Sequence, residues 1–170
     1  MLAKCISCRL NTHFSGFAWC LLYMIKKILV ATDASAASSR AVSFAARLSV
    51  QHEAELLILN VIREMQLPEE LKQAPEFEDF LNARDDLMRQ AADQILKNAK
   101  QKAKKDGAKN IQTAIGSGDP ATSVAGFARR RNVDLIVVGT RGLSKIKAAS
   151  MGSVSRKLLD LTDVNCLVIR

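Results

Sequence analysis

The stretch Met24-Ile-Lys-Lys-Ile-Leu-Val-Ala-Thr-Asp33 decides the class of fold. Within it, residues 28–31 form a continuous apolar run that ends in a threonine and an aspartate. An unbroken run of this length, without the polar alternation of a half-exposed strand, is typical of a strand buried on both faces of a parallel sheet. The sequence therefore predicts an α/β protein with a buried strand at 28–31.

Strand and helix signals alternate along the rest of the chain. We expect five strands, at 28–31, 56–62, 110–115, 135–138 and 166–169. We expect helices at 37–51, 76–105 and 153–161, with another that begins at Asp119-Pro120. Such alternation implies right-handed crossovers and one open, parallel, doubly wound sheet with helices on both faces. We predict a Rossmann-like fold with the strand order 3-2-1-4-5.

The predicted helix at 76–105 carries a long apolar stripe. Its apolar residues recur at three- and four-residue steps, at Phe77, Phe80, Leu81, Leu87, Met88, Ala91, Ile95 and Ala99. A stripe with this period is one face of an amphipathic helix. We interpret it as core rather than as a partner-binding face.

Composition and charge exclude several classes of function. Of the 170 residues 48% are apolar and 25% are charged, as in a single soluble globular domain. The net charge of +8 raises the possibility of nucleic-acid binding. However, the segment richest in basic residues, 97–105, has the period of a solvated helix face and contains no interleaved aromatic residues. We expect a cytoplasmic protein with no membrane contact and no specific nucleic-acid binding.

The first 23 residues differ in composition from everything after Met24. They hold no acidic residue and three of the four cysteines, so a disulfide framework is not expected. Cys5, Cys8, His13 and Cys20 suit zinc in type but miss the spacing of a zinc knuckle, and the apolar run at 17–25 lacks the cleavage site of a signal peptide. The favoured interpretation is that 1–23 is disordered or precedes the true start, and that the working domain is 24–170.

A glycine-rich segment follows the strand at 135–138. It reads Gly139-Thr140-Arg141-Gly142, then nine residues, then Gly152-Ser153 at the start of a helix. Ligands of open α/β sheets lie beyond the carboxyl ends of the strands, and a helix amino end there offers unpaired N–H groups to phosphate. The segment is therefore consistent with a phosphate site, in which Ser153 would be a hydroxyl donor and Arg141, Lys145 and Lys147 would supply countercharge. Taken alone, it is equally consistent with an ordinary turn.

Three segments together resemble the universal stress protein family. They are Met24 to Asp33, Asp134-Leu-Ile-Val-Val-Gly-Thr-Arg-Gly142 and Gly152-Ser-Val-Ser155, and the resemblance runs in register to Arg170. The glycine pattern of its ATP-binding members is Gly, two residues, Gly, nine residues, Gly, then Ser or Thr. It is matched at Gly139, Gly142, Gly152 and Ser153.

The resemblance implies a set of ligand-binding residues. Asp33 would contact the adenosine, the backbone of Val61 would read the adenine edge, and residues 139–155 would wrap the ribose and phosphates. The implied set is Ala31, Thr32, Asp33, Val61, Gly139, Thr140, Arg141, Gly142, Gly152, Ser153, Val154 and Ser155. The implied cofactor is ATP, with Mg²⁺ bridging its phosphates. Taken alone, Asp33 is also consistent with a helix cap.

The leading functional hypothesis is an ATP-binding regulatory protein of the stress response. A slow ATP hydrolase and a nucleotide-independent dimeric interaction protein remain the alternatives. The resemblance also implies a homodimer that pairs through the last strand. The chain departs from the family at Ala34, where glycine is usual, and at Asn165, where proline is usual. The segment 116–121 fits a dinucleotide fingerprint only loosely and is interpreted as a weak signal.

Overall fold

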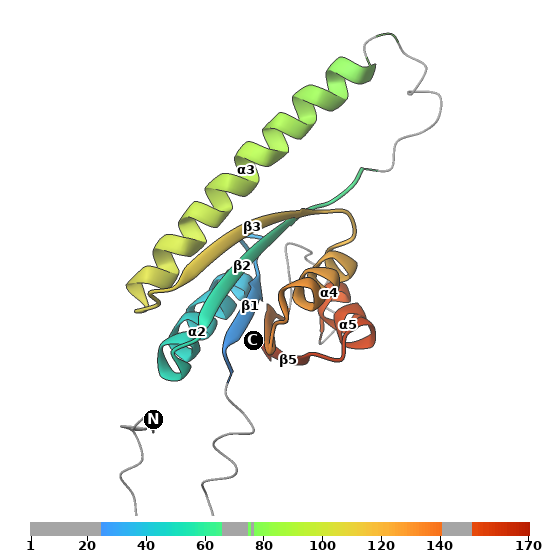
Figure 1. Cartoon of the computed structure of the whole chain (residues 1–170). Helices are drawn as coiled ribbons and strands as arrows, with labels where there is room; N and C mark the ends of the chain where they lie inside the picture. The colour runs from blue at the N-terminus through green and yellow to red at the C-terminus, as the bar shows by residue number, and fades with distance from the viewer. Residues whose placement is uncertain (1–24, 66–74, 76, 141–150) are drawn as a thin grey trace, which may run out of the picture.

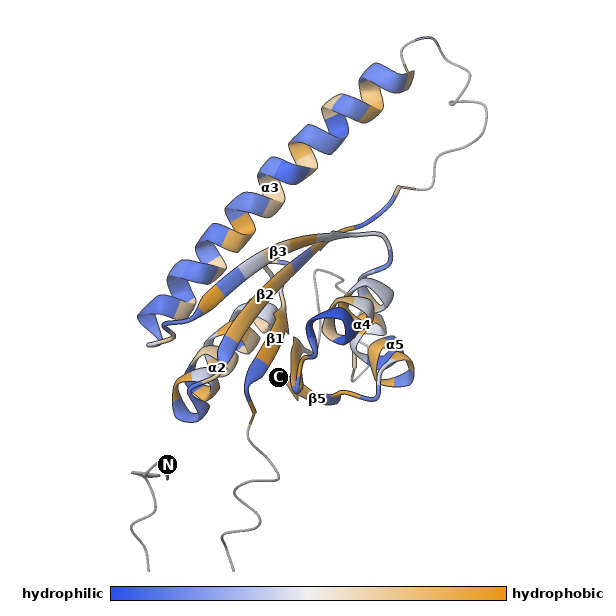
Figure 2. Cartoon of the chain, viewed as in Figure 1, coloured by the Kyte–Doolittle hydropathy of each residue, from blue (hydrophilic) through white to orange (hydrophobic). Residues whose placement is uncertain are grey.

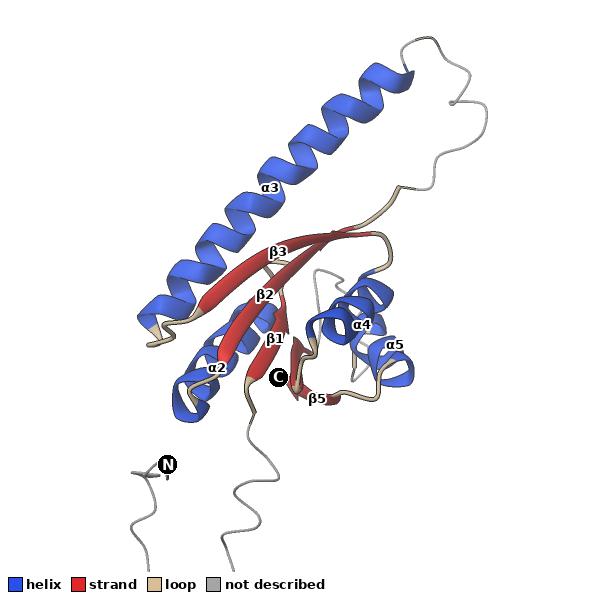
Figure 3. Ribbon diagram, in the orientation of Figure 1, coloured by secondary structure: helices blue, strands red, loops and turns tan. Residues whose placement is uncertain are grey.

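The computed structural model describes residues 25–65, 75, 77–140 and 151–170. These residues form nine elements, shown in Figures 1 and 3: β1 (Lys27–Ala31), α2 (Ala36–His52), β2 (Glu55–Ile62), α3 (Phe77–Lys105), β3 (Ile111–Ser117), α4 (Pro120–Arg131), β4 (Leu135–Gly139), α5 (Ser153–Leu161) and β5 (Asn165–Ile169). The strands form one parallel sheet in the order β3-β2-β1-β4-β5. The predicted fold class and strand order are confirmed.

The central strand β1 is buried on both faces, as its unbroken apolar run predicts. Ile28, Leu29 and Val30 are fully buried, and Leu29 pairs in register with Leu57 of β2 and Ile136 of β4. Figure 2 shows that hydrophobic residues concentrate on the strands and on the helix faces turned toward them. Burial of this apolar surface is the main term that stabilises the sheet.

Two helical layers cover the two faces of the sheet. Buried residues of α2 and α3 pack with Ile28, Val30 and Ile58, whereas buried residues of α4 and α5 pack with Leu29 and Leu57. The chain therefore crosses on one face between β1 and β3 and on the other face between β3 and β5. The connections that leave β1 and β4 diverge to opposite faces, so the carboxyl ends of these neighbouring strands form a topological switch point.

The helix α3 corrects one prediction. Its buried residues are Ala92, Leu96, Ala99 and Ala103, all in its carboxyl-terminal half. Phe80 and Leu87 of the amino-terminal half are 52% and 63% exposed, so this part of the predicted stripe is not core. The reason is length: at 29 residues α3 spans about 44 Å. The longest strand, at eight residues, spans only about 26 Å. Figure 1 shows the amino-terminal half of α3 extending past the sheet.

The described residues contain no helix that combines the length and the apolar character needed to cross a membrane. The strand β3 lies at one edge of the sheet, and all but the first of its residues are at least partly exposed.

Candidate functional site

The turn after β1 places a carboxylate at the switch point. Ser35 is the N-cap of α2, and its side chain accepts a hydrogen bond from the Ser38 N–H. Asp33 Oδ1 accepts a hydrogen bond from the Ser35 N–H at 3.0 Å. Partial burial acts to raise the pKa of Asp33, but hydrogen bonds from Ser35 and Ser38 outweigh burial and hold that pKa below its usual value. Asp33 is therefore an ionised carboxylate that orders the turn, while Ser35 is the helix cap.

A buried amide joins the ends of β1 and β2. Asn60 Nδ2 donates to the Thr32 carbonyl at 2.7 Å, and the Thr32 N–H donates to the Leu59 carbonyl at 2.9 Å. These bonds place Asp33 beside the end of β2, where Val61 lies. Sequence reasoning missed Asn60, although an asparagine inside the apolar run of β2 is a signal that a buried partner exists.

Ala31 and Val61 belong to the face of the sheet covered by α4 and α5. Both are partly buried against the core cluster on that face. They lie at the carboxyl ends of neighbouring strands, as the predicted site requires.

The end of β4 is fixed by contacts on both sides. A Cβ on Gly139 would lie 2.8 Å from the Ala37 carbonyl carbon, so β4 approaches the first turn of α2 more closely than any side chain permits. Ser155 Oγ donates to the Gly139 carbonyl at 2.8 Å. The Ser155 hydroxyl thus anchors α5 to β4, which is a structural role.

Thr140 connects β5 to the start of α5. Its N–H donates to the Ile169 carbonyl at 2.7 Å, and its carbonyl accepts from the Gly152 N–H at 2.6 Å. Gly152 is the N-cap of α5 with φ −67° and ψ 155°, an extended conformation open to any residue. The backbone conformation at this position therefore does not by itself require glycine.

The amino end of α5 differs from those of α2 and α4. Ser35 caps α2 and Asp119 caps α4, each through a side-chain hydrogen bond, but Gly152 gives α5 no such bond. The first-turn N–H groups of a helix need acceptors, and an anion satisfies them and the helix dipole together. Among α2, α4 and α5, the helices whose N-cap residues the structure describes, α5 is the one without a side-chain cap.

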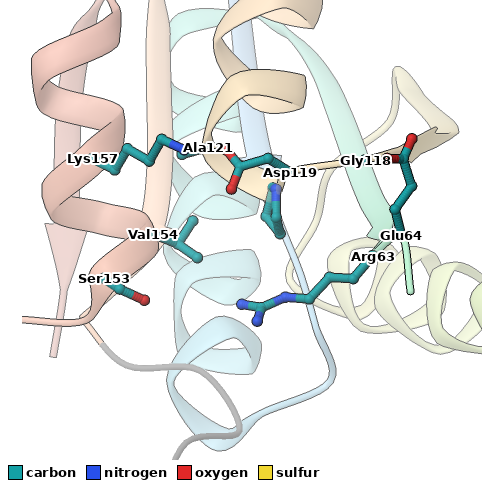
Figure 4. Close-up of a pocket in the computed structure, with 9 residues that line it drawn as sticks. Arg63, Glu64, Gly118, Asp119, Ala121, Ser153, Val154 and Lys157 are labelled. Carbon is teal, nitrogen blue, oxygen red and sulfur yellow. Dashed lines mark ion pairs between the residues drawn. The ribbon is translucent and has the colours of Figure 1, made fainter. Parts of the chain in front are cut away.

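A cavity of about 340 Å³ lies beside this uncapped end (Figure 4). Its volume is within the range of small-molecule sites. It is lined by Arg63, Glu64, Gly118, Asp119, Pro120, Ala121, Ser153, Val154 and Lys157. Two predicted site residues, Ser153 and Val154, therefore share a cavity with residues that follow β2 and β3.

An ion pair spans the cavity between α4 and α5. Lys157 Nζ lies 3.1 Å from Asp119 Oδ1. Both side chains are drawn in Figure 4. Asp119 also accepts hydrogen bonds from the Thr122 N–H at 3.0 Å and from the Thr122 hydroxyl at 2.8 Å. The Thr122 N–H, the Thr122 hydroxyl and Lys157 together lower the pKa of Asp119 to about 2. The Asp119 carboxylate is therefore ionised, and Thr122 and Lys157 are its partners.

Several predicted residues fall outside the described part of the chain. They are Arg141, Gly142, Lys145 and Lys147 of the glycine-rich segment. The residues considered as zinc ligands, Cys5, Cys8, His13 and Cys20, also lie outside it. Conversely, sequence reasoning missed Arg63, Gly118, Asp119 and Lys157 as cavity residues. The signal was present in Asp119-Pro120, which marks a helix start at the carboxyl edge of the sheet.

Comparison with known proteins agrees with this architecture. The universal stress protein YxiE of Bacillus subtilis (strain 168) is 35% identical over 149 residues, which cover 86% of this chain and 100% of that protein. The structure of UspA from Lactobacillus plantarum has a TM-score of 0.68 at 26% identity and covers 87% of this chain and 99% of its own.

A universal stress protein crystallised in complex with cAMP has a TM-score of 0.61 at 26% identity, over 85% of this chain and 96% of its own. A model of the universal stress protein family matches residues 24–170. This chain therefore belongs to the universal stress protein family.

Proposed function

We propose that this protein binds ATP at the carboxyl edge of its sheet and acts as a nucleotide-responsive regulator in the stress response. The observation that carries the proposal is the uncapped amino end of α5, which lies beside a cavity lined by Ser153 and Val154. A helix terminus without its own cap beside a cavity suits a phosphate group, because phosphate oxygens accept hydrogen bonds from free backbone N–H groups.

The sequence pattern and one relative support the choice of an adenine nucleotide. Gly139, Gly142, Gly152 and Ser153 have the spacing found in ATP-binding members of the family. A family member of the same fold was crystallised with cAMP, which is also an adenine nucleotide. In the proposed complex Asp33 and the Val61 backbone contact the nucleoside, while Gly152, Ser153 and the α5 amino end contact phosphate.

Magnesium would accompany the phosphates. The described residues include no group of three histidine, cysteine, aspartate or glutamate side chains placed to hold a metal. Mg²⁺ is commonly held by substrate phosphates with one or two carboxylates, and it neutralises phosphate charge. We therefore assign no Mg²⁺ site made by the protein alone.

The contacts of Thr140 suggest how nucleotide state would reach a partner surface. Its N–H bonds to Ile169 of β5, and its carbonyl bonds to Gly152 at the α5 amino end. A ligand that shifts the start of α5 would act through Thr140 on the terminal strand. The proposed output is a change in dimer contacts or in partner binding at β5.

Isothermal titration with MgATP and with adenosine tests the proposal. Asp33→Ala should weaken both ligands, whereas Ser153→Ala should weaken ATP and leave adenosine unchanged. Loss of one good polar contact corresponds to about a tenfold change in affinity. Matched controls are Asp93→Ala, on the exposed side of α3, and Ser43→Ala in α2, which should bind as the wild type does. Wild-type protein that shows neither heat nor a thermal shift with millimolar MgATP would overturn the proposal.

A further inference from the structure

Arg63 follows β2 and sends its side chain into the cavity. It lies two residues after Val61, which packs on the face of the sheet covered by α4 and α5. Because side chains alternate along an extended chain, Arg63 continues on that same face. Figure 4 shows its guanidinium directed toward Ser153 and Val154, while the carboxylate of Glu64 is directed toward Gly118.

The backbone of Arg63 is held by α3, whereas its guanidinium makes no hydrogen bond or ion pair with another described residue. The Arg63 carbonyl accepts a hydrogen bond from Arg84 Nη2 of α3 at 3.0 Å, which ties this segment to the helix. Within the described part of the chain, no hydrogen bond or ion pair engages the Arg63 guanidinium. The cavity's other cation, Lys157, is paired with Asp119. Among the described residues that line the cavity, Arg63 is thus the cation whose donors are unused.

We propose that Arg63 binds the phosphate groups of the nucleotide, from the β2 side of the cavity and facing Ser153, and so sets the preference for nucleotide over nucleoside. The inference rests on the proposed function. A guanidinium presents a planar fork of N–H donors that matches two phosphate oxygens at once. The α5 amino end would hold the same phosphate group from the other side.

The carboxylates that line the cavity do not oppose this role. Asp119 already accepts from Thr122 and pairs with Lys157. Glu64 is directed toward Gly118, away from the Arg63 guanidinium (Figure 4). A phosphate group placed between Arg63 and Ser153 would meet N–H and O–H donors on both sides.

Titration of ATP and of adenosine into Arg63 variants tests the assignment. Arg63→Gln should weaken ATP by about tenfold or more and leave adenosine unchanged. Arg63→Lys keeps the charge without the planar fork, so its ATP affinity should fall between the two. The wild type should also lose ATP affinity more steeply with salt than Arg63→Gln does. The control is Arg129→Gln, which removes the same charge from the last turn of α4 and should bind ATP normally.

Each outcome separates the two proposals. If Arg63→Gln weakens ATP and adenosine equally, Arg63 contacts the nucleoside and the phosphate assignment is wrong. If Arg63→Gln binds ATP as tightly as the wild type, the assignment fails while the proposed function stands. If the wild type binds no ATP, both fail. Without ligand, Arg63→Gln should melt at the same temperature as the wild type. If Arg63→Gln does not fold, the ATP and adenosine affinities of Arg63→Lys test the phosphate assignment instead.

Discussion

Gly139 lies against the first turn of α2 so closely that its missing side chain is a packing requirement. A Cβ there would be 2.8 Å from the Ala37 carbonyl carbon and 2.9 Å from the Ser38 nitrogen. Both obstructing atoms belong to the backbone, so they can yield only if α2 moves away from β4. The glycine of the nucleotide-binding pattern thus has a structural reason independent of any ligand.

We predict that Gly139→Ala destabilises the protein by about 1 to 3 kcal/mol, the usual cost of overpacking a tight contact. Urea denaturation would measure the change. Gly126→Ala in α4 is the matched control, because its Cβ would meet only the mobile end of Arg130, at 3.3 Å. Alanine in a helix is favoured by about 1 kcal/mol over glycine, so this control should be neutral or stabilising. Equal stability of Gly139→Ala and wild type would contradict the contact.

Ala34 adopts a conformation that suits glycine. Its φ is 64°, in the left-handed region, at the position where the family usually has glycine. A side chain in that region costs roughly 1 to 2 kcal/mol, and glycine recovers most of it at the expense of some unfolded-state entropy. Ala34→Gly should therefore raise the midpoint of denaturation.

The opposite sign is expected for the same substitution elsewhere. Ala91 is exposed and helical in α3, so Ala91→Gly should destabilise by about 1 kcal/mol. Thermal melting of the two variants side by side compares them directly. A lower melting temperature for Ala34→Gly would show that the turn does not strain Ala34.

The sequence was sufficient for the sheet and insufficient for the extent of α3. Apolar runs predicted β1, β2, β4 and β5, because a strand buried in the sheet has few polar positions, and a weaker alternating pattern predicted the edge strand β3. The period of the α3 stripe identified a face of the helix, but not how much of that face the sheet reaches. Spacing within one segment led to the prediction of Gly139 and Ser153 as site residues. Arg63 was not predicted, because it lies outside the glycine pattern and only the geometry of the cavity shows that its side chain is directed toward α5.

The two halves of α3 should respond differently to truncation. Leu96 is 5% exposed, whereas Leu87 is 63% exposed. Leu96→Ala should cost about 2 to 5 kcal/mol, through lost burial and a residual cavity. Leu87→Ala should change stability by less than about 0.5 kcal/mol. Urea denaturation of both variants measures the contrast, and a large loss for Leu87→Ala would mean that the exposed half of α3 is covered in solution.

The cap of α4 should make part of the stability depend on pH. The folded protein lowers the pKa of Asp119 to about 2, so folding favours the ionised form. Its contribution is fully present above about pH 4, the usual aspartate range, and is lost as pH falls through the folded pKa. At neutral pH, Asp119→Ala should cost about 1 kcal/mol, typical of a lost cap.

That difference should shrink between about pH 4 and pH 2, because the wild-type carboxylate becomes protonated there. Urea denaturation of wild type and variant at several pH values measures it. Asp93→Ala provides the control, since Asp93 is exposed on α3 and should show little difference at any pH. A gap between wild type and Asp119→Ala that is constant down to pH 2 would show that the charge of Asp119 does not contribute.

The terminal strand β5 leaves an apolar edge that we expect a second copy of the chain to pair with. Residues 166–169 of β5 are only partly buried, and β5 is the last strand of the sheet. An unpaired apolar edge strand promotes aggregation unless another strand or element covers it. Leu167→Lys should therefore shift the mass measured by light scattering from dimer to monomer. Ile115→Lys, on the exposed edge strand β3, should leave the mass unchanged.

The proposed coupling through Thr140, between nucleotide at the α5 amino end and the dimer contacts of β5, can be measured on the same wild-type protein. If nucleotide at α5 alters β5, saturating MgATP should change the dimer dissociation constant, and dimerisation should change the ATP affinity by the same factor. Circular dichroism of Leu167→Lys verifies that the monomer is folded, since Leu167 also packs against the core. Wild-type protein that is monomeric at about 10 to 100 μM, an ordinary range for interface affinities, would contradict the dimer, whether or not ATP binds.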